Sequence, residues 1–191
     1  QPPRAKASVA FITGARQKEG VFPIWGVLDN IGISRIALQG PFGLVNRKSQ
    51  TETILPFADQ LKLDYNRLDS NILDLSGGNQ QKALVARSLL VDAQTILLDD
   101  PTRGVDIATK QDFYEICAKI KSTGKTLIWY SSEERELLMA DRVFVFVSGK
   151  IATVLEDLDV CEDKILASSF AEVKKNSDRT DNGGRNRKQW E

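Results

Sequence analysis

Residues 75–82 read LSGGNQQK and have the composition of an anion-binding loop. A serine and two glycines lead into the apolar helical pattern ALVARSLL, which begins at Ala83. A loop that feeds a helix N-terminus presents free backbone N–H groups and the positive end of the helix dipole, and both attract an oxyanion. The stretch is not a P-loop, because that motif needs two glycines five positions apart followed by Lys and Ser or Thr. The sequence therefore predicts a phosphate site of another kind.

A second stretch, TILLDDPTRGVD (residues 95–106), could hold a metal ion. Thr95–Asp99 is a short continuous apolar run, which is typical of a strand buried on both faces. A carboxylate at the C-terminal end of such a strand lies where open α/β sheets bind ligands. With a nucleotide there, Asp99 would hold Mg²⁺ directly or through water, and Asp100 would face the attacking water. The alternative is that these residues only end the strand, since Asp and Pro are common turn residues.

The elements that must position these stretches alternate between strands and helices. The predicted strands are SVAFIT (8–13), TILLD (95–99), TLIWYS (126–131), RVFVFV (142–147) and the hairpin strand KIATVLE (150–156). The predicted helices are a helical region at 27–66, a helix that ends at about 91, and helices at 107–121, 133–141 and 159–171. Gly and Pro residues favour an irregular loop over 14–26. Strands alternating with helices indicate a largely parallel sheet with crossover helices.

Composition excludes several classes of function. The 191 residues contain 26 basic and 26 acidic side chains, so no overall field favours nucleic acid, and the absence of histidine excludes Ser-His triads and His-ligated metals. No apolar run is long enough for a membrane span, and no signal-peptide pattern opens the chain, which indicates a cytosolic protein. The chain starts QPPRAKAS, without Met, and reaches a strand at once, which suggests a fragment. The charged stretch 172–191 is predicted to be a disordered tail.

The order of these stretches resembles the ATP-binding-cassette (ABC) ATPases. LSGGNQQK is similar to their signature motif, TILLDD to Walker B and PTRGVD to the D-loop region. The individual residues of these motifs resemble the second cassette of bacterial sugar importers of the ribose and galactose type. The resemblance covers about Val9 to Ala171. It implies an α/β fold of the P-loop NTPase type, with a mostly parallel sheet, flanking helices and a helical subdomain at about 27–92. Residues 1–171 would then be a partial cassette whose N-terminal part is missing.

The resemblance also implies ATP and Mg²⁺ as cofactors and a role for each residue of these stretches. In this family two cassettes meet head to tail, and the signature of one closes over ATP held by the P-loop of the other. Ser76, Gly77 and Gly78 would bind the γ-phosphate, because glycine permits close backbone approach. Asn79 and Gln80 would cap the helix start and steady the loop. Asp99 would be the metal ligand, and Asp106 would be the residue that crosses the interface. Asp100 and Ser132 would be the catalytic positions.

Four departures from the family pattern lie on the chain's own catalytic side. No Walker A motif occurs, and Asp100 stands where the family has glutamate. Ser132 replaces the switch histidine, and it has an alternative role as a helix N-cap followed by two glutamates. In the segment that resembles the Q-loop, Gly14 and Ala15 replace Gln or Glu-Asp and leave only Arg16. Gly14 can equally be a turn residue, and Arg16 a solvated charge.

The leading hypothesis is an ATP-binding subunit of an importer for sugars or similar small solutes. It would supply its signature to another cassette, serve a transmembrane permease, contact a periplasmic solute-binding protein only indirectly, and lie on the cytoplasmic face of the membrane. Alone, the chain is expected to be inactive. The alternative is a non-catalytic regulatory or scaffold cassette. A DNA-repair or chromosome-organising ATPase would need long heptad arms and a basic face, and neither is present.

Overall fold

A computed structural model describes residues 8–39 and 46–170, and its contacts divide the chain into two units, with the boundary between Ser132 and Glu133. Each unit has its own cluster of buried apolar side chains. The predicted disordered tail, residues 172–191, lies outside the described residues. Within the part of the chain that the structure describes, no helix is long and apolar enough to cross a membrane.

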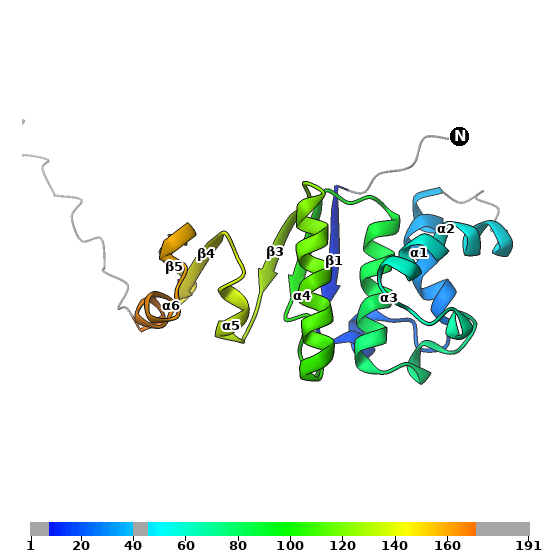
Figure 1. Ribbon diagram of the computed structural model, residues 1–191, viewed down its shortest axis with the longest axis horizontal. Coiled ribbons are helices and arrows are strands. Elements are labelled where there is room, and N and C mark those ends of the chain that lie inside the picture. The colour runs from blue at the N-terminus through cyan, green and yellow to red at the C-terminus, as the bar shows by residue number, and fades with distance from the viewer. Residues whose placement is uncertain (1–7, 40–45, 171–191) are drawn as a thin grey trace, which may run out of the picture. The chain divides into compact units, whose positions relative to one another are not determined.

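A three-stranded parallel sheet forms the centre of the first unit (Figure 1). Its strands, in spatial order, are β1 (Val9–Thr13), β2 (Thr95–Asp99) and β3 (Thr126–Tyr130). Helix α4 (Ile107–Ser122) connects β2 to β3 and runs alongside the strands. The register places Phe11, Leu97 and Ile128 in one row across the sheet. The predicted strands are confirmed: β2 has the expected bounds, and β1 and β3 each differ by one residue at one end.

The two faces of this sheet differ in burial, because alternate strand residues point to opposite faces. Ile12, Ile96 and Leu98 belong to the buried core together with helical side chains. On the opposite face, the side chain of Phe11 is 58% exposed and that of Ile128 is 55% exposed. β2 is therefore buried on one face and only half-buried on the other, which corrects the expectation of burial on both faces.

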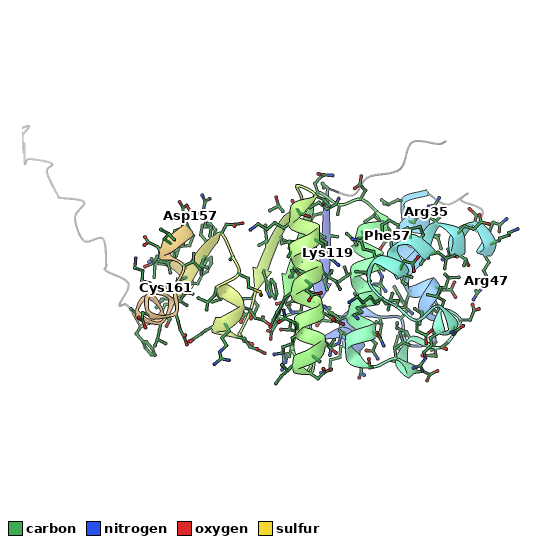
Figure 2. The ribbon with its side chains drawn as sticks, viewed as in Figure 1. Arg35, Arg47, Phe57, Lys119, Asp157 and Cys161 are labelled. Carbon is green, nitrogen blue, oxygen red and sulfur yellow. The ribbon has the colours of Figure 1, made fainter. Side chains whose placement is uncertain are left out.

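A helical region lies between β1 and β2 in the sequence. It contains α1 (Val27–Gln39) and α2 (Arg47–Gln60), and α3 (Gly77–Leu90) follows after two 3₁₀ turns, Tyr65–Arg67 and Ile72–Asp74. α1 packs against α3, and α2 contacts both helices around the fully buried Ile31 and Ile54. Arg47 projects at the surface of this region (Figure 2), where it pairs with Asp69. The helices expected between residues 27 and 66 are present.

A π-helical turn, Arg16–Gly20, follows β1 where an irregular loop was expected. The N–H of Val21 donates to the carbonyl of Arg16 at 2.9 Å and closes the turn. Arg87, from the distant helix α3, donates to the carbonyls of Gly20 at 2.7 Å and Asn30 at 2.6 Å. The turn depends on hydrogen bonds from residues far away in the sequence, so local turn chemistry could not reveal it.

The second unit is a β-hairpin with a short helix on each side in the sequence. It contains α5 (Glu134–Leu137), β4 (Arg142–Val147), β5 (Lys150–Glu156), a 3₁₀ turn at Asp157–Asp159 and α6 (Glu162–Ser169). β4 and β5 are antiparallel, with a register shift between Val145 and Phe146. Their inward side chains pack with Ile165 of α6. The predicted hairpin is confirmed, because β4 pairs with β5.

Candidate functional site

The predicted anion-binding stretch lies at the first turn of α3. The helix begins at Gly77, and Ser76 is its N-cap, whose Oγ accepts a hydrogen bond from the N–H of Asn79 at 3.3 Å. Ser76 is exposed, so its hydroxyl is accessible from solvent. A serine hydroxyl and a helix N-terminus therefore meet at one point of the surface, and together they can donate hydrogen bonds to an oxyanion.

The capping role predicted for Asn79 and Gln80 is wrong in part. The helix starts at Gly77, ahead of the apolar pattern, so Asn79 lies inside the first turn and Ser76 caps it. Gln80 is buried, and its Nε2 donates to the carbonyl of Leu75 at 3.0 Å. Gln80 thus steadies the loop before the helix, as expected, but from within the helix.

The start of α4 packs directly on the start of α3. A Cβ at Gly78 would lie 2.1 Å from Cγ2 of Thr109, so only glycine fits there without movement of α4. Asp106 is the N-cap of α4: its Oδ1 accepts from the N–H of Thr109 at 3.0 Å, and its Oδ2 from the Thr109 hydroxyl at 2.7 Å. These hydrogen bonds, the hydroxyl one foremost, hold the pKa of the Asp106 carboxyl below its ordinary value. The structure thus brings the LSGG stretch and Asp106 together through Thr109.

Arg16 places a positive charge beside the same turn. Its Nη1 donates to the carbonyl of Arg103 at 3.0 Å, and its Nη2 would be 3.1 Å from a Cβ at Gly77. Burial lowers the pKa of the Arg16 guanidinium, and within residues 8–39 and 46–170 no carboxylate pairs with it. A cation next to the positive end of a helix is unfavourable unless an anion binds between them. The alternative interpretation, that Arg16 is only a solvated charge, is therefore wrong.

The Asp-Asp pair lies at the C-terminal end of β2. Asp99 is exposed, and Asp100 has a left-handed backbone with φ +47°. The Ser132 hydroxyl donates to both carboxylate oxygens of Asp100, at 3.1 and 3.2 Å. The alternative that Ser132 caps a helix is wrong, because α5 starts at Glu134 with Glu133 at its N-cap position. The structure therefore brings Ser132 and Asp100 together, and the hydrogen bonds from Ser132 occupy the Asp100 carboxylate.

Gly14 is fixed by the backbone of the Asp-Asp pair. Its N–H donates to the carbonyl of Asp99 at 2.7 Å, and a Cβ at this position would lie 2.1 Å from the carbonyl oxygen of Asp100. No side chain fits in that space. The family's glutamine at this point would therefore require the backbone of β1 or β2 to move.

The donor set around Asp99 suits a magnesium ion that arrives with a nucleotide. Among the described residues, no group of three or more His, Cys, Asp or Glu side chains could hold a metal ion. Magnesium usually binds through one or two carboxylates and substrate phosphates rather than an all-protein cage. The exposed Asp99 carboxylate fits that arrangement.

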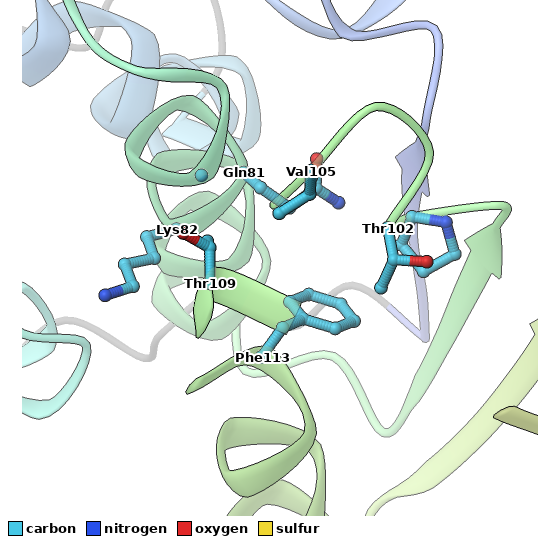
Figure 3. Close-up of a pocket in the computed structure, with 8 residues that line it drawn as sticks. Gln81, Lys82, Thr102, Val105, Thr109 and Phe113 are labelled. Carbon is cyan, nitrogen blue, oxygen red and sulfur yellow. The ribbon is translucent and has the colours of Figure 1, made fainter. Parts of the chain in front are cut away.

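A narrow hollow lies between α3, α4 and the loop that joins β2 to α4 (Figure 3). Its lining residues are Gly78, Gln81, Lys82, Pro101, Thr102, Val105, Thr109 and Phe113. Lys82 is buried and its Nζ pairs with Asp112 of α4 at 2.9 Å, which lowers the pKa of the Asp112 carboxyl. The hollow therefore adjoins both the LSGG stretch and the loop that ends at Asp106.

Sequence reasoning missed Thr109 and Gln81 and undervalued Arg16. The Asp106–Thr109 spacing, an N-cap residue followed three positions later by a hydrogen-bonding side chain, was a usable signal for Thr109. Gln81 and Arg16 gave no local signal, because their surroundings come from segments distant in the sequence.

The sequence model of the ABC transporter family matches residues 4–103. The ribose import ATP-binding protein of Corynebacterium glutamicum is 36% identical over 88% of this chain and 32% of its own length. The D-allose import ATP-binding protein of Escherichia coli is 33% identical over 85% of this chain and 33% of its own length. The chain thus spans about a third of the length of the curated relatives it matches.

Solved structures of ATP-binding cassettes have the same fold. A dimeric, post-hydrolysis cassette bound to ADP and phosphate matches with a TM-score of 0.66 at 21% identity, over 80% of this chain and 63% of that one. An inward-facing metal-chelate type ABC transporter matches with a TM-score of 0.73 at 20% identity, over 85% of this chain and 64% of that one. The chain therefore belongs to the ABC transporter family and has the α/β fold of its ATPase domains.

Proposed function

We propose that this chain acts in an importer of sugars or similar small solutes by presenting its signature to ATP held by another cassette. The observation that carries the proposal is the first turn of α3. There Ser76, Gly77 and Gly78 combine a hydroxyl with the N-terminus of a helix, and the Arg16 guanidinium lies alongside. An anion is the ligand that this set of donors favours.

The other residues have assigned roles in the same mechanism. Asp106 would contact the other cassette from the start of α4, while Asn79 and Gln80 hold the first turn of α3 in place. Asp99 would bind Mg²⁺, which neutralises charge on the phosphates when bound. Asp100 and Ser132 are the catalytic candidates on the chain's own side, where Asp100 would orient water and Ser132 would donate to a phosphate.

The partners follow from the relatives, which are named as import ATP-binding proteins. A second cassette, packed head to tail, would hold the ATP, and a membrane permease would be driven by the opening and closing of the pair. A periplasmic solute-binding protein would act only through the permease. In this proposal the chain lies on the cytoplasmic face of the membrane. Residues 1–171 would form the cassette portion, with a helical subdomain at about 27–92.

A scaffold cassette without turnover is the second candidate, and two observations favour it. The Asp100 carboxylate already accepts hydrogen bonds from Ser132, and the Gly14 position has no room for the family's glutamine. Both features weaken hydrolysis at the chain's own site and leave the first turn of α3 unaffected.

The test is a titration of the chain with Mg-ATP, alone and then mixed with an intact cassette that has its own Walker A motif. We expect no tight binding by the chain alone and faster phosphate release in the mixture. If the mixture releases phosphate no faster than the intact cassette by itself, the scaffold candidate replaces the proposed function.

Two variants separate the anion-binding role of Ser76 from its capping role. Ser76→Ala removes both, whereas Ser76→Asp keeps an N-cap acceptor and places a negative charge where the phosphate would bind. We expect both variants to lose the stimulation and only Ser76→Ala to lose helix stability, by about 1 kcal/mol. Stimulation that survives Ser76→Asp would show that no anion binds at this turn.

A further inference from the structure

Two neighbouring glutamines of α3 are buried, and only one of them is hydrogen-bonded. Gln80 is 3% exposed, and its Nε2 donates to the carbonyl of Leu75 at 3.0 Å. Gln81 is 2% exposed, and neither its Nε2 nor its Oε1 has a hydrogen-bond partner in the described part of the chain. The hollow that Gln81 lines contains no volume that a water molecule could occupy. A buried carboxamide in such surroundings destabilises the fold, so its presence requires an explanation.

Gln81 lies between the LSGG turn and the loop that ends at Asp106, the two segments to which the proposed function assigns a role. It follows Gly77 by four residues and Gly78 by three, so it is on the same side of α3 as the LSGG turn. Figure 3 shows Gln81 reaching from α3 towards the loop that carries Thr102 and Val105. This loop ends at the α4 N-cap, so the carboxamide faces the segment that would meet the other cassette.

The loop contains residues that can change conformation. Asp100 and Gly104 both have left-handed backbone angles, φ +47° and φ +66°. Two turn hydrogen bonds lie within the loop, from Arg103 N–H to Asp100 and from Val105 N–H to Thr102, each at 3.1 Å, and Arg16 donates to its Arg103 carbonyl. A non-glycine residue in the left-handed region stores strain that a small rearrangement can release. The loop lines the same hollow as the Gln81 carboxamide, so its backbone N–H and carbonyl groups are the nearest candidates for partners.

We propose that Gln81 is a positioning residue whose carboxamide hydrogen-bonds the backbone of loop 101–105 when the chain closes over a nucleotide held by another cassette. The inference rests on the proposed function. Hydrogen bonds formed only in the closed state favour that state, because a group that is unpaired in one conformation and paired in the other shifts the equilibrium between them. Gln81 then transmits phosphate binding at the LSGG turn to the loop that ends at Asp106.

The first measurement is the melting temperature of Gln81→Met. Methionine has a similar length and no unpaired polar atoms, so we expect the Tm of the isolated chain to rise by roughly 2–4 °C. The matched control is Gln80→Met, which removes a hydrogen bond that is formed and should lower the Tm. If Gln81→Met lowers the Tm as well, the carboxamide is paired in the free chain and the inference is wrong, whether or not the chain stimulates any cassette.

The second measurement is ATP hydrolysis by an intact cassette mixed with each variant. With Gln81→Met we expect kcat to fall about tenfold, the effect of one to two lost hydrogen bonds, while the KM for Mg-ATP changes less than about twofold, since the other cassette holds the nucleotide. Ser88→Ala is the control within α3: it removes only the bond from its Oγ to the Leu84 carbonyl, away from loop 101–105, and it should leave kcat unchanged.

The two failures are distinguishable. If the unmodified chain does not stimulate hydrolysis, the proposed function fails and the role of Gln81 in closure fails with it. If the unmodified chain stimulates and Gln81→Met stimulates equally well, the proposed function stands and the inference alone is overturned.

Discussion

The first turn of α3 and the ends of strands β2 and β3 belong to the same unit but are built differently. At the first turn, Gly78 is buried against Thr109, and Thr109 is in turn held by both oxygens of Asp106. At the strand ends, Asp99 is exposed, and Asp100 sits on a left-handed turn with its carboxylate taken by Ser132. The part of the chain that would act on another cassette's nucleotide is packed between helices, whereas its own carboxylates lie at the end of β2 and on the turn that follows it.

The glycines of the two regions also have different effects. A glycine at the first turn, Gly78, lets α4 approach α3 closely. A glycine at the strand ends, Gly14, lets β1 approach the Asp100 carbonyl and leaves no room for a catalytic side chain. The same residue type therefore permits close packing of two helices in one region and of two strand ends in the other.

The largest effect is expected when α3 loses the support of Arg87. Its guanidinium donates to the carbonyls of Gly20 and Asn30 and to the side chain of Asn30, and burial lowers its pKa to about 10. Arg87→Met keeps the apolar stem but removes all three of these hydrogen bonds, and the Asn30 Oδ1 then accepts only the one from the Phe22 N–H. We expect the free energy of unfolding to fall by about 3–5 kcal/mol, measured by urea denaturation.

The matched control for Arg87 is Arg67, whose Nη2 donates to the carbonyl of Asp74 at 2.9 Å in a solvent-exposed bond. Water can replace that donor, so Arg67→Met should change the free energy of unfolding by less than about 0.5 kcal/mol. Equal losses in the two variants would mean that α3 is no better supported than the surface, and the contrast between the two regions would lose its basis.

A smaller effect is expected where α3 and α4 touch. Gly78→Ala would place its Cβ 2.1 Å from Cγ2 of Thr109, and such overpacking costs about 1–3 kcal/mol. Thr109→Ser removes that methyl group and keeps the hydroxyl that bonds Asp106. The double variant should therefore regain part of the lost melting temperature. If it regains none, the contact between the two helix starts does not limit the packing of this region.

At the strand ends, the left-handed backbone of Asp100 restricts which side chain fits this position. Asp and Asn tolerate the left-handed region better than longer side chains, because their short polar groups bond locally. Asp100→Glu should therefore lower stability by about 1 kcal/mol, whereas Asp100→Asn should be close to neutral. Thermal unfolding of the pair measures this. A neutral Asp100→Glu would show that the φ of +47° imposes no restriction on residue type.

Local patterns predicted the elements of the fold well. The apolar runs of β2, β4 and β5 gave their observed bounds, because a continuous or alternating run flanked by turn residues is a local signal. The helix over 107–121 was likewise found as Ile107–Ser122. The order of the strands was harder to predict, since β1 pairs with β2 across more than 80 residues and such pairing is decided by non-local contacts.

The candidate site was predictable only where its contacts are local. The N-cap position of Asp106 follows from four consecutive residues, but the π-helical turn Arg16–Gly20 depends on Arg87, which is 67 positions from Gly20. Ser132 was assigned to a helix cap or a phosphate, and it bonds Asp100, which is 32 positions away. Residues that serve two distant segments carry no periodicity that could identify them.

The smallest effect is expected when Asp106 loses its charge but keeps a hydrogen-bond acceptor. This change tests whether the cap of α4 needs a carboxylate or only an acceptor. Bonds from Thr109 hold the Asp106 pKa below the ordinary value of 3.8, so the charged form contributes stability at pH values above 3.8, and this contribution is lost as pH falls through the lowered pKa. Asp106→Asn keeps an acceptor without the charge. The difference between the urea midpoints of the two proteins should be constant from neutral pH to about pH 5 and should shrink in more acidic solution. A difference that stays constant into strong acid would mean that the carboxylate charge does not contribute to the start of α4, and the polar link between Asp106 and Thr109 would then rest on hydrogen bonding alone.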